Sequence, residues 1–211
     1  MRQLSLAIVI AAFGMFCAPA ALAQPTVITP AGKASILAAP ATPFAGAPKG
    51  AVTVVEYFDV NCPYCKPMAP EIDQLISTTP GVRVLYKDWP IFGGVSVYAA
   101  RAGLAARWQN RYLQAHTELM RAPGRLASEA QVRDRLKAAS VDLPRLDRDL
   151  VAHAAEINAI LARNDAEAKR LAFQGTPGFV VGNFVVPGGM KLDDLRKLVE
   201  LSRPAKEGTS R

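Results

Sequence analysis

The hydrophobic residues follow different periods along the chain, and each change of period marks a predicted element. Residues 52–58 are almost all β-branched or aromatic, which is typical of a strand covered on both faces. Residues 82–87 alternate and predict a second strand, while residues 62–77 between them show helical spacing. This order predicts a parallel strand–helix–strand unit with a right-handed crossover. The apolar side of the predicted helix consists of Met68, Ile72, Leu75 and Ile76.

The second half of the chain changes to a helical pattern and then returns to strands. Residues 95–173 are dominated by Ala, Leu and Arg, with breaks near residue 123, at Ser140 and before Pro144, so they predict several helices. Residues 178–181 and 184–186 have strand character, and the Gly-Asn pair between them is typical of a two-residue hairpin. Apolar residues at helical spacing after residue 191 predict a closing helix. We therefore expect an α/β fold with an inserted helical subdomain.

The N-terminus has the three parts of a secretory signal peptide, which we place at residues 1–23. Arg2 supplies the positive charge, residues 4–16 form an apolar run, and residues 21–23 (Ala-Leu-Ala) form a small-residue cleavage site. The apolar run is shorter than the roughly 20 residues that a membrane span needs. We therefore expect cleavage after Ala23 and export to an oxidising compartment.

Two further segments flank the predicted domain. Residues 24–50 are rich in Ala and Pro and predict a lead segment that is partly extended, with a short helical turn near residues 33–38. Residues 203–211 are polar and predict a disordered tail. Neither segment carries a chemical motif.

The charge pattern and the cysteines limit the functions that the chain can have. The chain has 211 residues, half of them hydrophobic, and a net charge of +7. Its Lys and Arg residues alternate with Asp and Glu in helical segments, which predicts solvated helix faces rather than a nucleic-acid site. Of the three cysteines, Cys17 falls in the predicted signal peptide, so the mature chain would hold only Cys62 and Cys65. A single pair of cysteines this close in sequence does not form a structural disulfide framework for a chain of this size.

The motif Cys62-Pro63-Tyr64-Cys65 directly follows the first strand and opens the predicted helix. Proline is tolerated in the first turn of a helix, where no hydrogen bond is lost. Cys62 would lie at the exposed tip of that helix, where unpaired N–H groups and the helix dipole favour a thiolate. Cysteines in such motifs have pKa values lowered to about 3.5–7.5. We therefore predict a redox-active dithiol that needs no bound cofactor.

Two metal-binding hypotheses compete with this interpretation. A structural zinc site needs four ligands, and beside the cysteines the chain offers only His116 and His153, which we expect on helical faces as ordinary polar residues. A copper(I)-binding protein would use Cys62 and Cys65 as soft ligands. We expect no metal site, but the copper(I) hypothesis stays open.

Several motifs in combination give the chain a family resemblance. They are the Cys-Pro-Tyr-Cys motif after a strand, the loop at residues 89–93 (Trp-Pro-Ile-Phe-Gly) and the segment 175–183 (Gly-Thr-Pro-Gly-Phe-Val-Val-Gly-Asn). Together they resemble exported thiol:disulfide interchange proteins of the DsbA-like group, in particular a subgroup that contains periplasmic copper-tolerance proteins. The resemblance implies a thioredoxin fold with an inserted helical subdomain. It divides the chain into a first part of the fold (51–94), the insertion (95–173) and a second part (174–202).

The resemblance also implies roles for individual residues. Cys62 would be the attacking or attacked cysteine and Cys65 the resolving one, with Pro63 and Tyr64 tuning the reduction potential. The peptide bond between Thr176 and Pro177 would be cis and face the cysteines, and its loop would offer backbone groups to an extended substrate.

Glu56, in the middle of the first strand, matches a buried acid that such proteins place beneath the active site. There it would relay a proton to or from Cys65, and burial would raise its pKa. The alternative is an ion pair between Glu56 and Lys87 on the neighbouring strand.

The functional hypothesis is a periplasmic thiol:disulfide oxidoreductase. Its partners would be cysteine-containing exported proteins and a membrane redox protein, and its only redox group the Cys62–Cys65 disulfide. A disulfide isomerase or reductase of the same fold, linked to copper stress, is the alternative within this class. The motifs leave the oligomeric state open.

Overall fold

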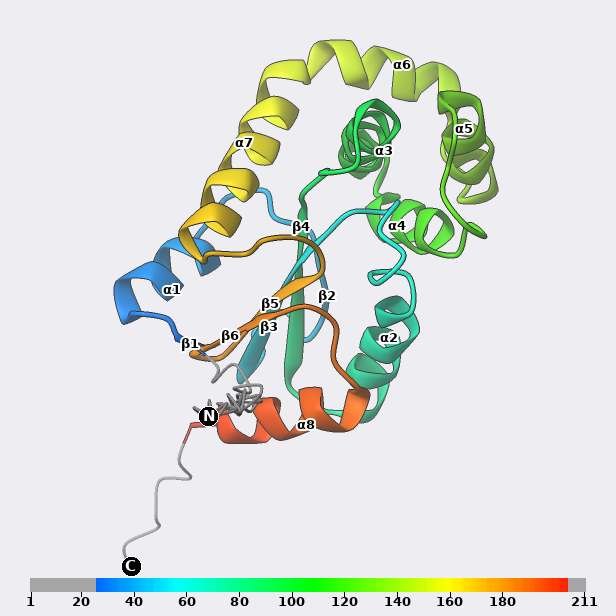
Figure 1. The fold of residues 1–211 in the computed structure, drawn as a ribbon. Helices are drawn as coiled ribbons and strands as arrows, with labels where there is room; N and C mark the ends of the chain where they lie inside the picture. The colour runs from blue at the N-terminus through cyan, green and yellow to red at the C-terminus, as the bar shows by residue number, and fades with distance from the viewer. Residues whose placement is uncertain (1–25, 205–211) are drawn as a thin grey trace, which may run out of the picture.

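A six-stranded mixed sheet forms the centre of the protein (Figure 1). The computed structural model describes residues 26–204. The strands are β1 (Thr26–Val27), β2 (Phe44–Gly46), β3 (Val52–Phe58), β4 (Val82–Asp88), β5 (Gly178–Val181) and β6 (Phe184–Pro187). The helices are α1 (Pro30–Leu37), α2 (Met68–Thr78), α3 (Gly94–Ala105), the 3-10 helix η1 (Ala106–Gln109), α4 (Tyr112–Met120), α5 (Glu129–Ala138), α6 (Leu143–Ala152), α7 (Ala154–Arg170) and α8 (Leu192–Leu201).

The strand order is β1-β6-β5-β3-β4-β2. β3 and β4 pair in parallel, and β5 runs antiparallel to β3. The predicted parallel unit and the predicted hairpin of β5 and β6 are therefore confirmed. The hairpin turn requires its glycine, because Gly182 has a φ of +58° and a Cβ there would lie 2.1 Å from Ser202 Oγ.

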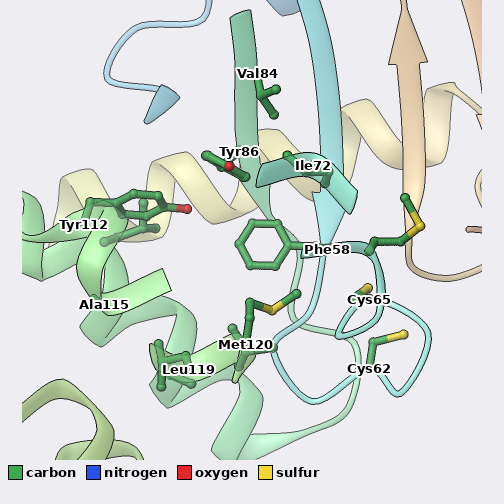
Figure 2. Close-up of a cluster of buried hydrophobic side chains, with 14 of the residues drawn as sticks. Phe58, Cys62, Cys65, Ile72, Val84, Tyr86, Tyr112, Ala115, Leu119 and Met120 are labelled. Atoms are coloured by element: carbon green, nitrogen blue, oxygen red, sulfur yellow. The ribbon is translucent and has the colours of Figure 1, made fainter. Parts of the chain in front are cut away.

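The two faces of the sheet bury different sets of side chains. On one face, Val54, Phe58, Val84 and Tyr86 pack with the apolar residues of α2 and α8. Figure 2 shows Phe58, Val84 and Tyr86 near Ile72 of α2. On the other face, Val55, Tyr57 and Leu85 pack with residues of α1 and α7, among them Ile36 and Ala168. Because side chains alternate along a strand, each face is fixed by residue parity. Both strands are thus covered on both faces, which the pattern predicted for residues 52–58 only.

The lead segment takes part in the sheet. β1 pairs with β6 at one edge and β2 with β4 at the other, while α1 lies between them in sequence. The sequence pattern predicted only a partly extended segment with a short helical turn. Strands of two and three residues are too short to show a period, so no such signal was available.

The helical insertion, α3 to α7, stands between β4 and β5 as predicted (Figure 1). Two of its helices, α5 and α6, begin with a side-chain cap, since Ser128 Oγ accepts from Gln131 N–H and Asp142 Oδ1 accepts from Arg145 N–H. A left-handed residue at Asn110 separates η1 from α4, a break that the sequence pattern did not indicate.

Some predictions concern residues outside the described part of the chain. These are the signal peptide at residues 1–23, Cys17, and the tail from residue 205 onward. Within residues 26–204, none of the helices has both the length and the apolar character to cross a membrane.

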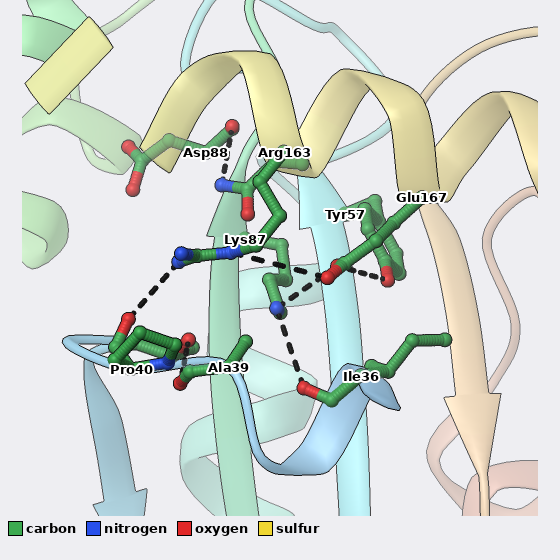
Figure 3. A network of polar contacts seen from close by, with 10 residues as sticks. Ile36, Ala39, Pro40, Tyr57, Lys87, Asp88, Arg163 and Glu167 are labelled. Atoms are coloured by element: carbon green, nitrogen blue, oxygen red, sulfur yellow. Dashed lines mark hydrogen bonds and ion pairs between the residues drawn. The ribbon is translucent and has the colours of Figure 1, made fainter. Parts of the chain in front are cut away.

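A buried polar network joins the lead segment to α7 and β4 (Figure 3). The Lys87 ammonium lies 2.9 Å from Glu167 Oε2, which also accepts from the Tyr57 hydroxyl at 2.9 Å. Lys87 further donates to the Ile36 carbonyl at 3.4 Å, and Arg163 donates to the Pro40 carbonyl at 3.0 Å. The network therefore holds α1 and the segment after it against the sheet.

Replacement of Lys87 by Met should destabilise the protein by about 3 kcal/mol, because it leaves the buried Glu167 carboxylate without its main partner. Urea unfolding measures the change. The double variant with Lys87→Met and Glu167→Gln removes both charges but keeps an oxygen for Tyr57, so it should lose less. A single variant no less stable than the double variant would contradict this role.

Candidate active site

Cys62 and Cys65 lie in the turn that follows the end of β3 (Figure 2). Both are free thiols, and both side chains are buried. The prediction that Cys62 lies at an exposed tip was therefore wrong. The Cys62 sulfur lies 3.1 Å from the carbonyl oxygen of Thr176, so the loop before β5 closes over it.

The regular helix begins later than predicted. α2 starts at Met68, and residues 63–67 form successive turns instead of an α-helix. Proline explains the difference, because Pro67 and Pro70 lack the N–H groups that would continue the i→i−4 ladder. The turn keeps a few bonds of its own, such as those from the N–H groups of Cys65 and Lys66 to the Cys62 carbonyl, at 3.2 and 3.4 Å.

Hydrogen bonds lower the pKa of Cys62 to about 6, against its ordinary value of 9.0. The largest contribution comes from the Cys65 side chain, and it outweighs the opposing effect of burial. Thr176 and the backbone N–H groups of Tyr64 and Cys65 add to the effect. The thiol form donates to the Thr176 carbonyl, whereas the thiolate can accept from the Thr176 hydroxyl, which has no other partner in the described chain. The predicted direction of the shift is confirmed.

Cys65 shifts in the opposite sense. Burial raises its pKa most, followed by the hydrogen bond it gives to Cys62 and the nearby Glu56 carboxyl. The same bond thus favours a proton on Cys65 and a negative charge on Cys62. The two sulfurs differ enough that Cys62 ionises first.

The peptide bond between Thr176 and Pro177 is cis, as the resemblance implies. Thr176 is buried, and the Pro177 carbonyl accepts from Gly188 N–H at 2.8 Å. The loop is therefore held at the sheet while its Thr176 carbonyl faces Cys62.

Glu56 lies on the same face of β3 as Phe58 and points its carboxyl into the protein. The side chain is buried, and neither carboxyl oxygen has a hydrogen-bond partner among the described residues. Burial raises its pKa to about 8, with smaller contributions from Asp88, Cys62 and Asp73. Glu56 is thus protonated at neutral pH, as expected for a desolvated acid.

The alternative ion pair between Glu56 and Lys87 is wrong. The pairing register places Glu56 opposite Tyr86 and Tyr57 opposite Lys87, so the two charged side chains project from opposite faces of the sheet. Lys87 pairs instead with Glu167 of α7.

Sequence reasoning missed Asp59 as a structural residue of the site. Its Oδ2 accepts from the N–H groups of Ile91 and Phe92, at 2.7 and 3.1 Å, and its Oδ1 accepts from Asn61 N–H at 2.8 Å. Asp59 thereby joins the turn of the cysteines to the loop after β4. An Asp directly after a strand is a signal for such backbone capping, but not for its remote partner.

The surface near the cysteines carries exposed apolar side chains. Tyr64, between the two cysteines, is 72% exposed. Ile91 and Phe92 are also exposed, and the Arg125 guanidinium lies 4.6 Å above the Phe92 ring.

The two histidines differ from each other. His153 stacks on Trp108 between α6 and α7. His116 lies on a helix, α4, as predicted, but it is not an ordinary polar residue there, because it is buried against the rings of Phe58 and Tyr86. Burial lowers the pKa of His116 to about 4, so it is neutral.

Within residues 26–204, no cluster of three or more His, Cys, Asp or Glu side chains could hold a metal ion. The cysteine pair therefore has no third ligand of these types in the described chain.

Comparison with known families gives a match to the DSBA-like thioredoxin domain over residues 53–200. A solved thioredoxin-like oxidoreductase from Silicibacter pomeroyi DSS-3 is 42% identical, with a TM-score of 0.77, and the match covers 81% of this chain and 97% of that one. The thiol-disulfide exchange protein alpha-DsbA2 from Wolbachia pipientis is 25% identical, with a TM-score of 0.75 and coverage of 80% and 90%. The catalytic domain of ScsC from Proteus mirabilis is 27% identical, with a TM-score of 0.71 and coverage of 82% and 94%.

A curated relative is much longer. The chain is 29% identical over 152 residues to Na(+)/H(+) antiporter NhaA 1 from Salinispora arenicola. The match covers 70% of this chain but only 22% of the antiporter, so the chain spans about a fifth of that relative's length.

The fold and family resemblance expected from the sequence are confirmed by the family match and the solved structures.

Replacement of Glu56 by Gln should change how stability depends on pH. Between the ordinary pKa of 4.5 and the folded value of about 8, the folded wild type keeps a proton that the unfolded chain releases. Wild-type stability should therefore fall as pH rises through this window, by up to about 1.4 kcal/mol per pH unit relative to the Gln variant. Urea unfolding of both proteins at about pH 5 and about pH 7.5 checks this. A constant difference between them would contradict a raised pKa.

Proposed function

Because the chain belongs to the family of DSBA-like thioredoxin domains, we propose that it is a thiol:disulfide oxidoreductase that works through Cys62 and Cys65. The supporting observation is that two free thiols lie beside the cis Thr176–Pro177 bond, with the Cys62 sulfur 3.1 Å from the Thr176 carbonyl oxygen. Their pKa values shift in opposite directions. A thiolate beside a protonated thiol is the arrangement that thiol–disulfide exchange requires.

In the oxidising direction, a substrate thiolate attacks the Cys62 sulfur of the Cys62–Cys65 disulfide. The sulfur–sulfur bond breaks, its electron pair passes to Cys65, and a mixed disulfide joins the substrate to Cys62. A second substrate thiolate then attacks the substrate sulfur of this bond and releases Cys62 as a thiolate. The low pKa of Cys62 makes it a good leaving group.

Cys65 needs a proton in the first of these steps, and the proton donor in this proposal is Glu56. The Glu56 carboxyl is protonated at neutral pH and lies close enough to raise the pKa of Cys65. In the reverse direction, the Cys62 thiolate attacks a substrate disulfide, and Cys65 resolves the mixed disulfide after its proton passes to the deprotonated form of Glu56.

Substrate would bind beside the loop of Thr176 and Pro177. An extended segment there gains backbone hydrogen bonds in the manner of strand addition. Tyr64 is exposed beside the cysteines, and with Pro63 it would tune the reduction potential of the pair.

The proposed place of action is the periplasm, with cysteine-containing exported proteins as substrates and a membrane redox protein as partner. The signal-like N-terminus supports export, and a solved neighbour, 26% identical, is described as a periplasmic thioredoxin-like protein from Salmonella enterica serovar Typhimurium. Such a compartment permits disulfides to persist.

The low pKa of Cys62 favours the oxidising direction, because a stabilised thiolate stabilises the reduced enzyme. Refolding of scrambled ribonuclease distinguishes this from the alternative of an isomerase or reductase. Tight stoichiometric copper(I) binding without thiol exchange would instead support the copper hypothesis.

The Cys62→Ser variant should reduce insulin no faster than the uncatalysed background, because the nucleophile is lost. The Cys65→Ser variant should instead accumulate a mixed disulfide with the substrate, visible on a non-reducing gel, because no thiol resolves it. Unfolding midpoints near that of the reduced wild type serve as the folding control. Full insulin reduction by the Cys62→Ser variant would contradict the proposed function.

A further inference from the structure

The turn that carries the cysteines contributes little to its own rigidity. Two prolines, at positions 63 and 67, leave it without backbone donors at these places, and a third, Pro70, lies in the first turn of α2. The regular ladder of α2 starts only at Met68. The position of residues 62–66 must therefore depend on ties to other parts of the protein.

Two side chains at the ends of this turn bind the same part of the helical insertion. Asn61, buried directly before Cys62, forms a reciprocal pair with Leu126: its Nδ2 donates to the Leu126 carbonyl at 3.2 Å, and its Oδ1 accepts from Leu126 N–H at 2.8 Å. Lys66, directly after Cys65, donates to the carbonyls of Ala122 and Leu119, at 2.7 and 3.4 Å.

These contacts are made by the end of α4 and the segment that leads to α5. The Lys66 ammonium interacts with carbonyls at the C-terminal end of α4, where a helix favours positive charge. Leu126 lies outside the sheet, and the Asn61 amide pairs with its backbone N–H and carbonyl as a neighbouring strand would. The helical insertion thus holds the turn from both sides of the cysteine pair.

We propose that Asn61 is a positioning residue that fixes the cysteine turn to the helical insertion, so that the Cys62 sulfur keeps its place 3.1 Å from the Thr176 carbonyl oxygen. This inference rests on the proposed function of the dithiol. According to this inference, the helical insertion affects the reactivity of Cys62 and also forms part of the surface around the site.

Asn61 is the better residue to test than Lys66. Loss of the Lys66 charge would disfavour a nearby thiolate directly, whatever happened to the geometry. Asn61 is neutral, and leucine has nearly its shape, so Asn61→Leu removes the two hydrogen bonds without changing charge. Asn61→Ser is a milder second variant in case the leucine variant does not fold.

The measurement is the pKa of Cys62 in the reduced protein, followed by thiolate absorbance in the ultraviolet. Both Asn61 variants should raise it by about one unit, because hydrogen bonds to the charged sulfur are weakened. The equilibrium with glutathione should shift toward the oxidised enzyme by about tenfold, since its reduced form is less stabilised. Asn164→Leu is the matched control. Asn164 lies on α7 and its buried amide donates to the Asp88 carbonyl of β4, so the variant removes this bond but should leave the pKa of Cys62 unchanged.

The outcomes separate this inference from the proposed function. A wild-type Cys62 that ionises like a free thiol would remove the basis of the proposed function itself. A low wild-type pKa that persists in a folded Asn61 variant would overturn only the positioning role. An equal rise in the Asn164 control would also overturn it, because the effect would then be a general consequence of lost stability.

Discussion

The interaction between the two buried cysteine side chains is the one on which the site depends. It lowers the pKa of Cys62 and raises that of Cys65, so a single contact assigns the two cysteines different protonation states. Burial alone would keep both thiols protonated. The surrounding elements matter because they keep the sulfurs adjacent: β3 ends just before them, and the loop of Thr176 closes over Cys62.

The sequence predicted the elements that show a long or regular pattern. β3, β4 and the β5–β6 hairpin lie where the apolar residues indicated, and Cys62 has the lowered pKa expected of its motif. The physical cause was only partly foreseen, since the Cys65 side chain contributes more than the backbone N–H groups. The cis bond before Pro177 was expected from the family resemblance and not from the residues themselves.

Other features depend on contacts that no local pattern encodes. Pro67 and Pro70 delay the helix, but the sequence does not show what holds the turn instead. Asn61 and Leu126 are 65 positions apart, and their pairing follows from the packing of the insertion against the sheet. The separation of Glu56 from Lys87 likewise depends on the register of β3 and β4. These contacts depend on the tertiary structure, because it fixes the register of neighbouring strands and the packing of the insertion against the sheet.

The most direct test of the central claim is the rate at which iodoacetamide alkylates the reduced protein as a function of pH, with mass spectrometry identifying the modified cysteine. We expect alkylation at Cys62, with a midpoint near pH 6, while Cys65 stays unmodified. A midpoint near 9, the ordinary value of a free thiol, or preferential modification of Cys65 would contradict the assignment.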